Sequence, residues 1–143
     1  MKKLFIIRHG KSDWGNPIIN DFNRPLNYRG LKDAPRIGQY LKANYDKPDL
    51  ILTSPAKRAL TTSHIIANNI SYDTSKILKQ DRIYLANLDT LLEVIQPLDD
   101  NLNCIYIFGH NPGLSTLASY LTDDWIEMKT CCVAVLEAKI DSW

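Results

Sequence analysis

The sequence has no long hydrophobic segment at its N-terminus. Two lysines are followed by an apolar run over residues 4–7 only, and this run stops at Arg8. Four residues are too few for the hydrophobic region of a signal peptide or for a membrane span. The segment is more typical of a buried first strand, and we expect a cytoplasmic protein without a membrane partner.

The sequence also has few cysteines and almost no excess of charge of either sign. The three cysteines, Cys104 and the adjacent Cys131 and Cys132, fit neither a disulfide framework nor paired zinc-ligand spacing, so we expect reduced core thiols. Seventeen basic residues against sixteen acidic ones give a net charge of +1. This balance gives no reason to expect a nucleic-acid partner, and any anion site must come from a local group of basic residues. No cluster of carboxylates indicates a metal site, and we expect neither a metal nor a cofactor.

The remaining pattern is that of one α/β domain over residues 1–143. Apolar runs of strand length alternate with segments of helical period, which predicts a largely parallel sheet with helices on both faces. The expected strands are Leu4 to Ile7, Leu50 to Thr53, Ile77 to Lys79, Cys104 to Phe108 and Cys132 to Ala138.

Four helices are expected between these strands. The first is capped by Asn27 and buries Leu31, Ala34, Ile37, Gly38 and Leu41, with a kink at Pro35; the second begins at Ser54-Pro55. The third runs from Leu88 towards Pro97, and the fourth begins at Asn111-Pro112 and buries Leu114, Leu117, Ala118 and Leu121. The connections Lys11 to Leu26 and Ile70 to Asn87 are long enough to be functional loops.

Three strand-to-helix junctions carry cations or imidazoles. Arg8-His9-Gly10 follows the first strand, Arg58 lies in the first turn of the second helix, and His110 follows the fourth strand. Each has an ordinary interpretation, namely a charged surface loop, a solvated arginine and a structural histidine. The carboxyl ends of parallel strands meet at one sheet edge, where α/β proteins bind ligands, so together they predict an anion site. The third histidine, His64, lies beside Ile65 and Ile66 on the second helix, which favours a structural role.

These segments resemble the histidine phosphatase superfamily. The resemblance is carried by Arg8-His9-Gly10, by the segment Ser54 to Thr62 and by Gly109 to Gly113; Asp21 to Leu26 is similar to the short SixA-type phosphohistidine phosphatases. It implies a three-layer αβα sandwich, phosphoglycerate mutase-like, with a mostly parallel central sheet. It also implies that His9 attacks phosphorus, that Arg8 and Arg58 hold the phosphoryl oxygens and that His110 donates to them. Gly10, Ser12, Arg24 and Asn111 would bind substrate, and Asp21 would orient Arg24.

One departure from the superfamily affects the choice of substrate. Larger members carry a glutamate as general acid where this chain has Gln80 to Tyr84, and Asp81 could replace it or simply form a surface ion pair. A phosphoramidate needs less help from an acid than an ester, which favours phosphohistidine on a partner protein as substrate. The alternatives are a phosphomonoesterase for a small metabolite and a non-catalytic phosphate- or phosphoprotein-binding module. Phosphate or sulfate should contact Arg8, His9, Arg58 and His110.

Overall fold

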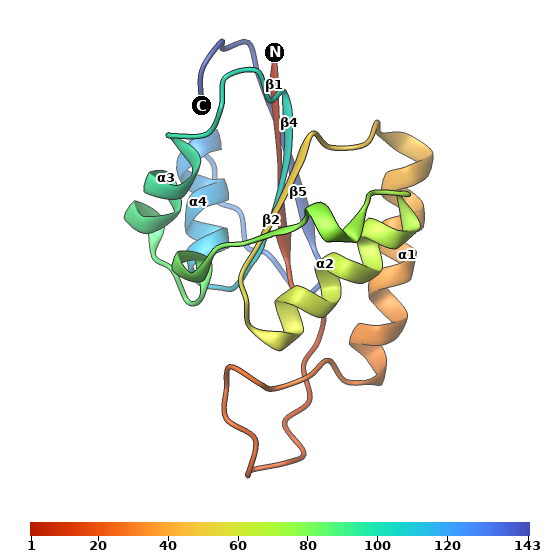
Figure 1. Cartoon of the computed structure of the whole chain (residues 1–143). Helices are drawn as coiled ribbons and strands as arrows, with labels where there is room; N and C mark the ends of the chain where they lie inside the picture. Colours follow the sequence, from red (N-terminus) through yellow and green to blue (C-terminus); the bar gives the residue numbers. More distant parts are fainter.

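The computed structural model describes residues 1–143 and contains one five-stranded sheet. Its strands lie in the order β3-β2-β4-β1-β5 (Figure 1). Their bounds are β1 Lys2–Arg8, β2 Leu50–Thr53, β3 Leu78–Lys79, β4 Cys104–Gly109 and β5 Val133–Ala138. All neighbours pair in parallel except β5, which runs antiparallel to β1 at one edge. The expected, mostly parallel sheet is therefore confirmed.

Two pairs of helices cover the two faces of this sheet (Figure 1). Helices α1 (Tyr28–Asn44) and α2 (Lys57–Asn69) lie on one face, and α3 (Leu88–Ile95) and α4 (Gly113–Thr122) lie on the other. Short 3-10 helices, η1 (Thr74–Lys76) and η2 (Asp81–Ile83), lie in the connection between α2 and α3. The arrangement is the expected αβα sandwich.

Side chains of β1 alternate between the two faces of the sheet and so contribute to two separate halves of the core. Phe5 and Ile7 pack with the α1 and α2 side, whereas Leu4 and Ile6 pack with α3 and α4, as successive residues of a strand point to opposite faces. Because β1 is covered on both faces, it reads in the sequence as a continuous apolar run. No helix of the structure is both long enough and apolar enough to cross a membrane.

Several helix predictions are wrong in detail. Helix α2 begins at Lys57 rather than at Ser54-Pro55, because the Ser54 hydroxyl accepts from the Ala56 N–H and the chain is still extended at Ala56. Leu31 and Leu121 were expected to be buried, yet their side chains are exposed. Each lies beside the buried stripe of its helix rather than within it.

Other expectations agree with the structure. The Asn27 side chain accepts from the Gly30 N–H and caps α1 as expected. Pro35, where a kink was expected, does not interrupt α1, which continues through it as one helix of 17 residues. Gly38 lets α1 and α2 approach closely, since a Cβ at this position would lie 2.6 Å from the Cβ of Asn69. By contrast, the structural role favoured for His64 is wrong, because its side chain is exposed on α2 rather than packed in the core.

Candidate active site

The three strand-to-helix junctions meet at the carboxyl edge of the sheet. Arg8 on β1 lies opposite Gly109 on β4, so His9 and His110 leave adjacent strands side by side, with ring centroids 5.2 Å apart. Arg58 follows β2, the next strand along. Together they line a cavity of about 270 Å³. Its lining residues are Arg8, His9, Lys11, Ser12, Trp14, Asp21, Arg24, Arg58, Leu85, His110, Asn111 and Thr130.

His9 has one ring nitrogen engaged and the other free. Its Nδ1 lies 2.6 Å from the carbonyl oxygen of Gly10, and because a carbonyl only accepts, Nδ1 carries the proton. Burial, helped by the charges of Arg58 and Arg8 and opposed by this hydrogen bond, lowers the pKa of His9 to about 4. The imidazole is therefore neutral at pH 7, with an unprotonated Nε2.

Gly10 keeps this histidine and the first turn of α1 in close contact. Its N–H donates to the Thr62 hydroxyl at 3.0 Å, and a Cβ at this position would lie 3.2 Å from the Cα of Gly30. A larger residue would push the loop away from α1. The glycine thus contributes through close backbone packing and through the carbonyl that fixes the tautomer of His9.

The arginines of the pocket carry hydrogen-bond donors without partners. Arg8 donates from Nη1 to the Met128 carbonyl, and Arg24 donates from Nη2 to Asp21. The Nε atoms of Arg8, Arg24 and Arg58 and the Nη1 of Arg24 are buried with no partner. Leaving buried donors unpaired costs free energy, so an anion in the cavity that accepts from them would be bound favourably.

Asp21 holds two of these arginines together. Its carboxylate accepts from Arg24 Nη2 at 2.9 Å and from Arg58 Nη2 at 3.1 Å, and its backbone carbonyl accepts from Arg58 Nη1 at 2.6 Å. The Tyr84 hydroxyl also donates to this carboxylate. Tyr84, followed by Arg24 and Arg58, holds the pKa of Asp21 well below its usual range, so the carboxylate stays ionised.

Sequence reasoning found only part of this arrangement. It expected Asp21 to orient Arg24, and the structure places the two in contact, but the contacts of Asp21 with Arg58 and Tyr84 were missed. Residues 21, 58 and 84 are far apart in the chain, and no sequence pattern signals that they meet.

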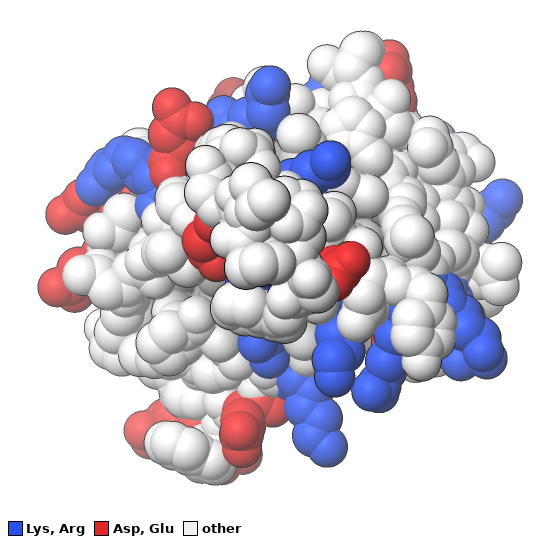
Figure 2. Space-filling model, turned by 90° about the horizontal axis from the view of Figure 1, so that it is seen from below, with Lys and Arg blue, Asp and Glu red and all other residues white.

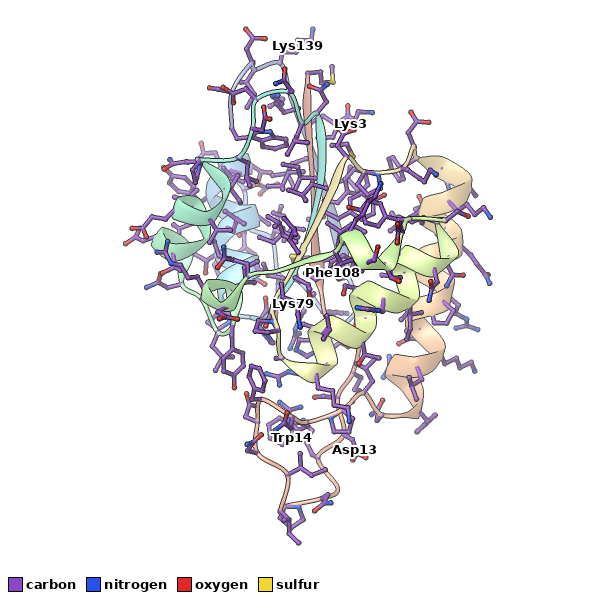
Figure 3. All side chains as sticks on the ribbon, in the orientation of Figure 1. Lys3, Asp13, Trp14, Lys79, Phe108 and Lys139 are labelled. Carbon is purple, nitrogen blue, oxygen red and sulfur yellow. The ribbon has the colours of Figure 1, made fainter.

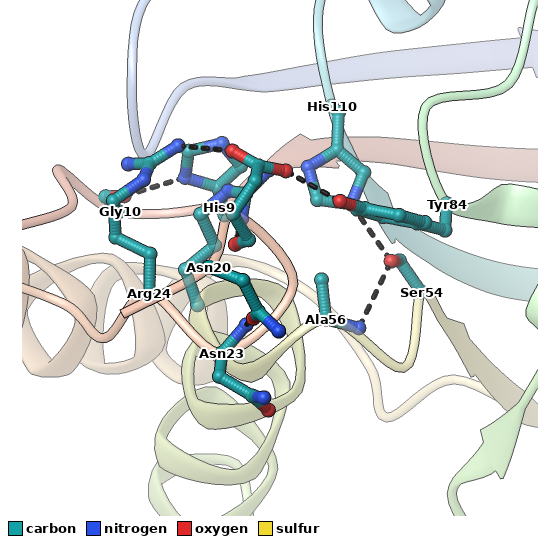
Figure 4. Close-up of polar contacts among 11 residues, drawn as sticks. His9, Gly10, Asn20, Asn23, Arg24, Ser54, Ala56, Tyr84 and His110 are labelled. Carbon is teal, nitrogen blue, oxygen red and sulfur yellow. Dashed lines mark hydrogen bonds and ion pairs between the residues drawn. The ribbon is translucent and has the colours of Figure 1, made fainter. Parts of the chain in front are cut away.

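His110 presents a free nitrogen to the cavity. Its Nε2 lies 2.7 Å from the Ser54 hydroxyl, while its buried Nδ1 has no partner and lies on the side of the ring that faces His9 (Figure 4). The Ser54 oxygen accepts from Ala56 and its O–H can donate to Nε2; in that arrangement the ring proton of His110 lies on Nδ1. Burial, then the charges of Arg58 and His9, lower the pKa of His110 to about 3. The ring is thus neutral, and in the tautomer with the proton on Nδ1 it is a donor aimed into the pocket.

The remaining predicted residues differ in how directly they reach the cavity. Ser12 is buried at the cavity wall and bridges to Leu26 across the loop. Asn111 lines the cavity too, but its side chain donates to Met128 and accepts from Ser115, so it braces the start of α4. The wall is completed by Lys11, Trp14, Leu85 and Thr130.

Asp81 lies outside the site. It is exposed at the start of η2 and does not line the cavity. It also does not pair with its neighbour Arg82, because Arg82 contacts Glu93 on α3 instead. Asp81 is therefore not placed to act as the general acid for a substrate in the cavity.

A larger cavity lies at the other end of the sheet. It has a volume of about 560 Å³ and is lined mainly by apolar residues of α3, α4, β5 and the C-terminal segment. The smaller cavity is the candidate site, because polar groups with perturbed pKa values and unpaired donors converge there. The structure contains no group of three or more His, Cys, Asp or Glu that could hold a metal ion.

Comparisons with known proteins identify the family of the chain. The family model for the histidine phosphatase superfamily (branch 1) matches residues 4–81. The uncharacterized chloroplastic protein At3g52155 of Arabidopsis thaliana is 30% identical over 152 residues, which cover 99% of this chain and 69% of that protein.

Solved structures of SixA proteins have the same fold. A protein of Agrobacterium tumefaciens assigned as the phosphohistidine phosphatase SixA is 26% identical, with a TM-score of 0.86 over 96% of this chain and 92% of that chain. A protein histidine phosphatase SixA in complex with tungstate is 20% identical, with a TM-score of 0.83 over 93% of this chain and 86% of that chain. The resemblance predicted from the motifs is confirmed, and it indicates phosphatase-type activity. The chain belongs to branch 1 of the histidine phosphatase superfamily.

Proposed function

We propose that this protein hydrolyses phosphohistidine on a partner protein, through a phosphohistidine formed at its own His9, and that it does so without a metal ion. One observation carries the proposal: an unprotonated imidazole nitrogen stands among arginine donors that have no partner, and the one carboxyl group that lines the cavity, that of Asp21, is held ionised. This combination suits the transfer of a phosphoryl group from a leaving group that departs without protonation by the enzyme.

The first step would form one N–P bond and break another. The lone pair of His9 Nε2 attacks phosphorus in line, and the bond from phosphorus to the substrate nitrogen breaks with its electron pair going to the leaving ring. The negative charge on the equatorial oxygens is met by Arg8, Arg24 and Arg58 and by the Nδ1–H of His110. Because the Gly10 carbonyl holds the Nδ1 proton of His9, the attacking nitrogen stays available.

The second step would return the enzyme to its starting state. A water oxygen attacks the phosphorus on His9, the N–P bond breaks, and its electrons return to Nε2. The arginines stabilise the same distribution of charge in both steps, so one pocket serves both. Inorganic phosphate then leaves the cavity.

The lack of a general acid supports phosphoramidates over esters. An alkyl ester needs protonation of its leaving oxygen, but Asp81 lies outside the cavity and Asp21 is held ionised by Tyr84 and the arginines. Phosphohistidine, with its other ring nitrogen protonated, departs as a neutral imidazole. The SixA protein solved with tungstate, an oxyanion of the same tetrahedral shape as phosphate, adds support for an oxyanion at this site.

A comparison of three substrates tests the proposal. We expect kcat/KM to be highest on a protein phosphorylated on histidine, lower on phosphoramidate, and measurable but low on p-nitrophenyl phosphate, whose leaving group needs no acid. His9→Ala should abolish turnover and also the acid-labile phosphate on the enzyme after rapid quenching.

Each alternative predicts a different outcome. Higher efficiency on a specific sugar phosphate than on phosphohistidine would favour the phosphomonoesterase. Binding of phosphate without turnover of any of the three substrates would favour a binding module. Near-normal turnover in His9→Ala would contradict the nucleophile assignment.

A further inference from the structure

Exposed apolar side chains lie at the wall of the cationic pocket and on the loop beside it. Trp14, Ile18 and Ile19 lie along the loop over residues 9–27, with exposed fractions of 76%, 91% and 38%, and Phe22 follows them on the same loop. Leu85, 57% exposed, lies across the pocket from another segment. We call these five residues the apolar rim. Single exposed apolar residues are ordinary, but a group of them around a binding site marks an interaction surface.

The loop that carries most of the rim is held in a defined shape. Asp13 N–H donates to the Pro25 carbonyl at 2.8 Å and Asn27 N–H donates to the Lys11 carbonyl at 2.9 Å, which pins the base of the loop. Lys57 N–H donates to the Phe22 carbonyl at 2.9 Å, which ties its returning half to α2. The tip is thus presented beyond the strand ends, with Trp14 on the side of the pocket (Figure 3).

The rim is continuous with the groups that would bind phosphate. The ring of Trp14 stacks on the Arg24 guanidinium, 3.6 Å from its central carbon, and Phe22 packs edge-on against Tyr84, which holds Asp21. Leu85 has a φ of 49°, a left-handed conformation unfavourable for leucine, and its side chain lies at the pocket wall. A ligand that contacts Trp14 and Leu85 would therefore also lie against the pocket that receives the phosphoryl group.

The charge around the rim favours a protein over a lipid surface. Residues 12–23 contain two aspartates and no lysine or arginine. The face toward which the loop projects is mostly uncharged at its centre, with its main cluster of Lys and Arg toward one edge (Figure 2). An anionic membrane attracts basic segments, so a tip of this composition gains nothing from it.

We infer that the apolar rim docks the protein that carries the phosphohistidine, through apolar side chains on the partner's surface next to the modified residue. This inference rests on the proposed function, and it names where the remaining binding energy comes from. The pocket wall is almost entirely polar and offers a substrate little apolar contact, whereas the rim adds exposed apolar area that a partner protein can cover. Specificity for a protein would then lie in the loop and in Leu85, outside the reacting groups.

A double substitution at the loop tip tests this inference. Ile18→Ser with Ile19→Ser removes apolar area from residues that do not line the pocket. Ile140→Ser is the matched control, because Ile140 is also exposed but lies beside the cavity at the other end of the sheet. Both proteins and the wild type are assayed on a set of purified proteins phosphorylated on histidine with phosphoramidate, and on phosphoramidate itself.

We expect the tip variant to lose at least tenfold in kcat/KM on the best protein substrate, mainly through KM, and to stay within twofold on phosphoramidate. The control should match the wild type on both substrates. Equal losses on the two substrates, or none on the protein, would overturn the inference while leaving the proposed function intact. Failure of the wild type on every phosphohistidine protein would overturn both.

Two further measurements address other occupants of the rim. Sedimentation with phosphatidylcholine vesicles containing phosphatidylserine would contradict the inference if the wild type bound and the tip variant did not. Self-association of the wild type that the tip substitutions abolish would assign the rim to a second copy of the chain, and would also contradict it.

Discussion

Lowering the pH should destabilise the folded protein through the two histidines of the pocket. Both are neutral when folded, with pKa values of about 4 for His9 and about 3 for His110, against an ordinary value near 6.5 in an unfolded chain. At pH values between the native pKa values and about 6.5, the unfolded state binds more protons than the folded state. The free energy of unfolding therefore falls as the pH drops below about 6.5, and falls further until the native pKa values are reached.

The size of this loss follows from the same values. At pH 5 nearly every unfolded imidazole is protonated while both folded ones are not, so each histidine lowers the free energy of unfolding by about 2 kcal/mol between pH 7 and pH 5. Two histidines together remove about 4 kcal/mol, a large share of the 5 to 15 kcal/mol that is usual for a domain. The result depends little on the native values, since both lie below pH 5.

Urea unfolding at pH 7 and pH 5, in buffers without phosphate, measures this effect. His9→Asn keeps a donor for the Gly10 carbonyl and His110→Gln keeps a polar contact for Ser54, so each variant should lose about half of the pH dependence. His64→Asn, which changes the exposed third histidine, is the control and should retain all of it. The reasoning is refuted if the double variant His9→Asn, His110→Gln destabilises with pH as much as the wild type does.

Three further outcomes concern turnover. Arg58→Ala should keep its fold by circular dichroism and lose ~100-fold in kcat, or about 3 kcal/mol of transition-state stabilisation, whereas an unchanged kcat would remove Arg58 from the phosphoryl site. Asp81→Asn should stay within twofold of the wild type on every substrate, because Asp81 lies outside the cavity; a selective loss on a sugar phosphate would make it a working general acid. Chelation with EDTA should leave steady-state turnover unchanged, and a loss that a divalent ion restores would contradict metal-independent catalysis.

The position of the candidate site could be predicted because it follows from sheet geometry. Arg8-His9, Arg58 and His110 each come after a strand of a parallel sheet, so the chain topology brings them to one edge whatever the loops do. The resemblance added Arg24 and Ser12, which no periodicity could have placed. The strands were found with nearly correct bounds, since a strand covered on both faces is an uninterrupted apolar run.

Features that depend on the tertiary path of a loop could not be predicted. The contact of Asp21 with Arg58 needs the loop over residues 9–27 to return across α2, and Tyr84 arrives from a different connection. Ser54 looked like a helix cap, but the nearby imidazole of His110 also uses its hydroxyl. Leu31 and Leu121 show that helical spacing identifies an apolar stripe without marking its borders.

The place of β1 in the sheet also governs the order in which the chain can fold as it is synthesised. Both of its neighbours come late, since Lys3 lies opposite Cys104 on β4 and opposite Glu137 on β5. At about 5 to 20 residues per second, roughly 100 residues must be added, over about 5 to 20 s, before β1 has any strand to pair with. Of the five strands, β1 is thus made first and is the last to gain a neighbour on both sides. Its apolar segment Phe5-Ile6-Ile7 stays unpaired until β4 has been made. During that time chaperones can bind this segment, or misfolded chains can associate with it.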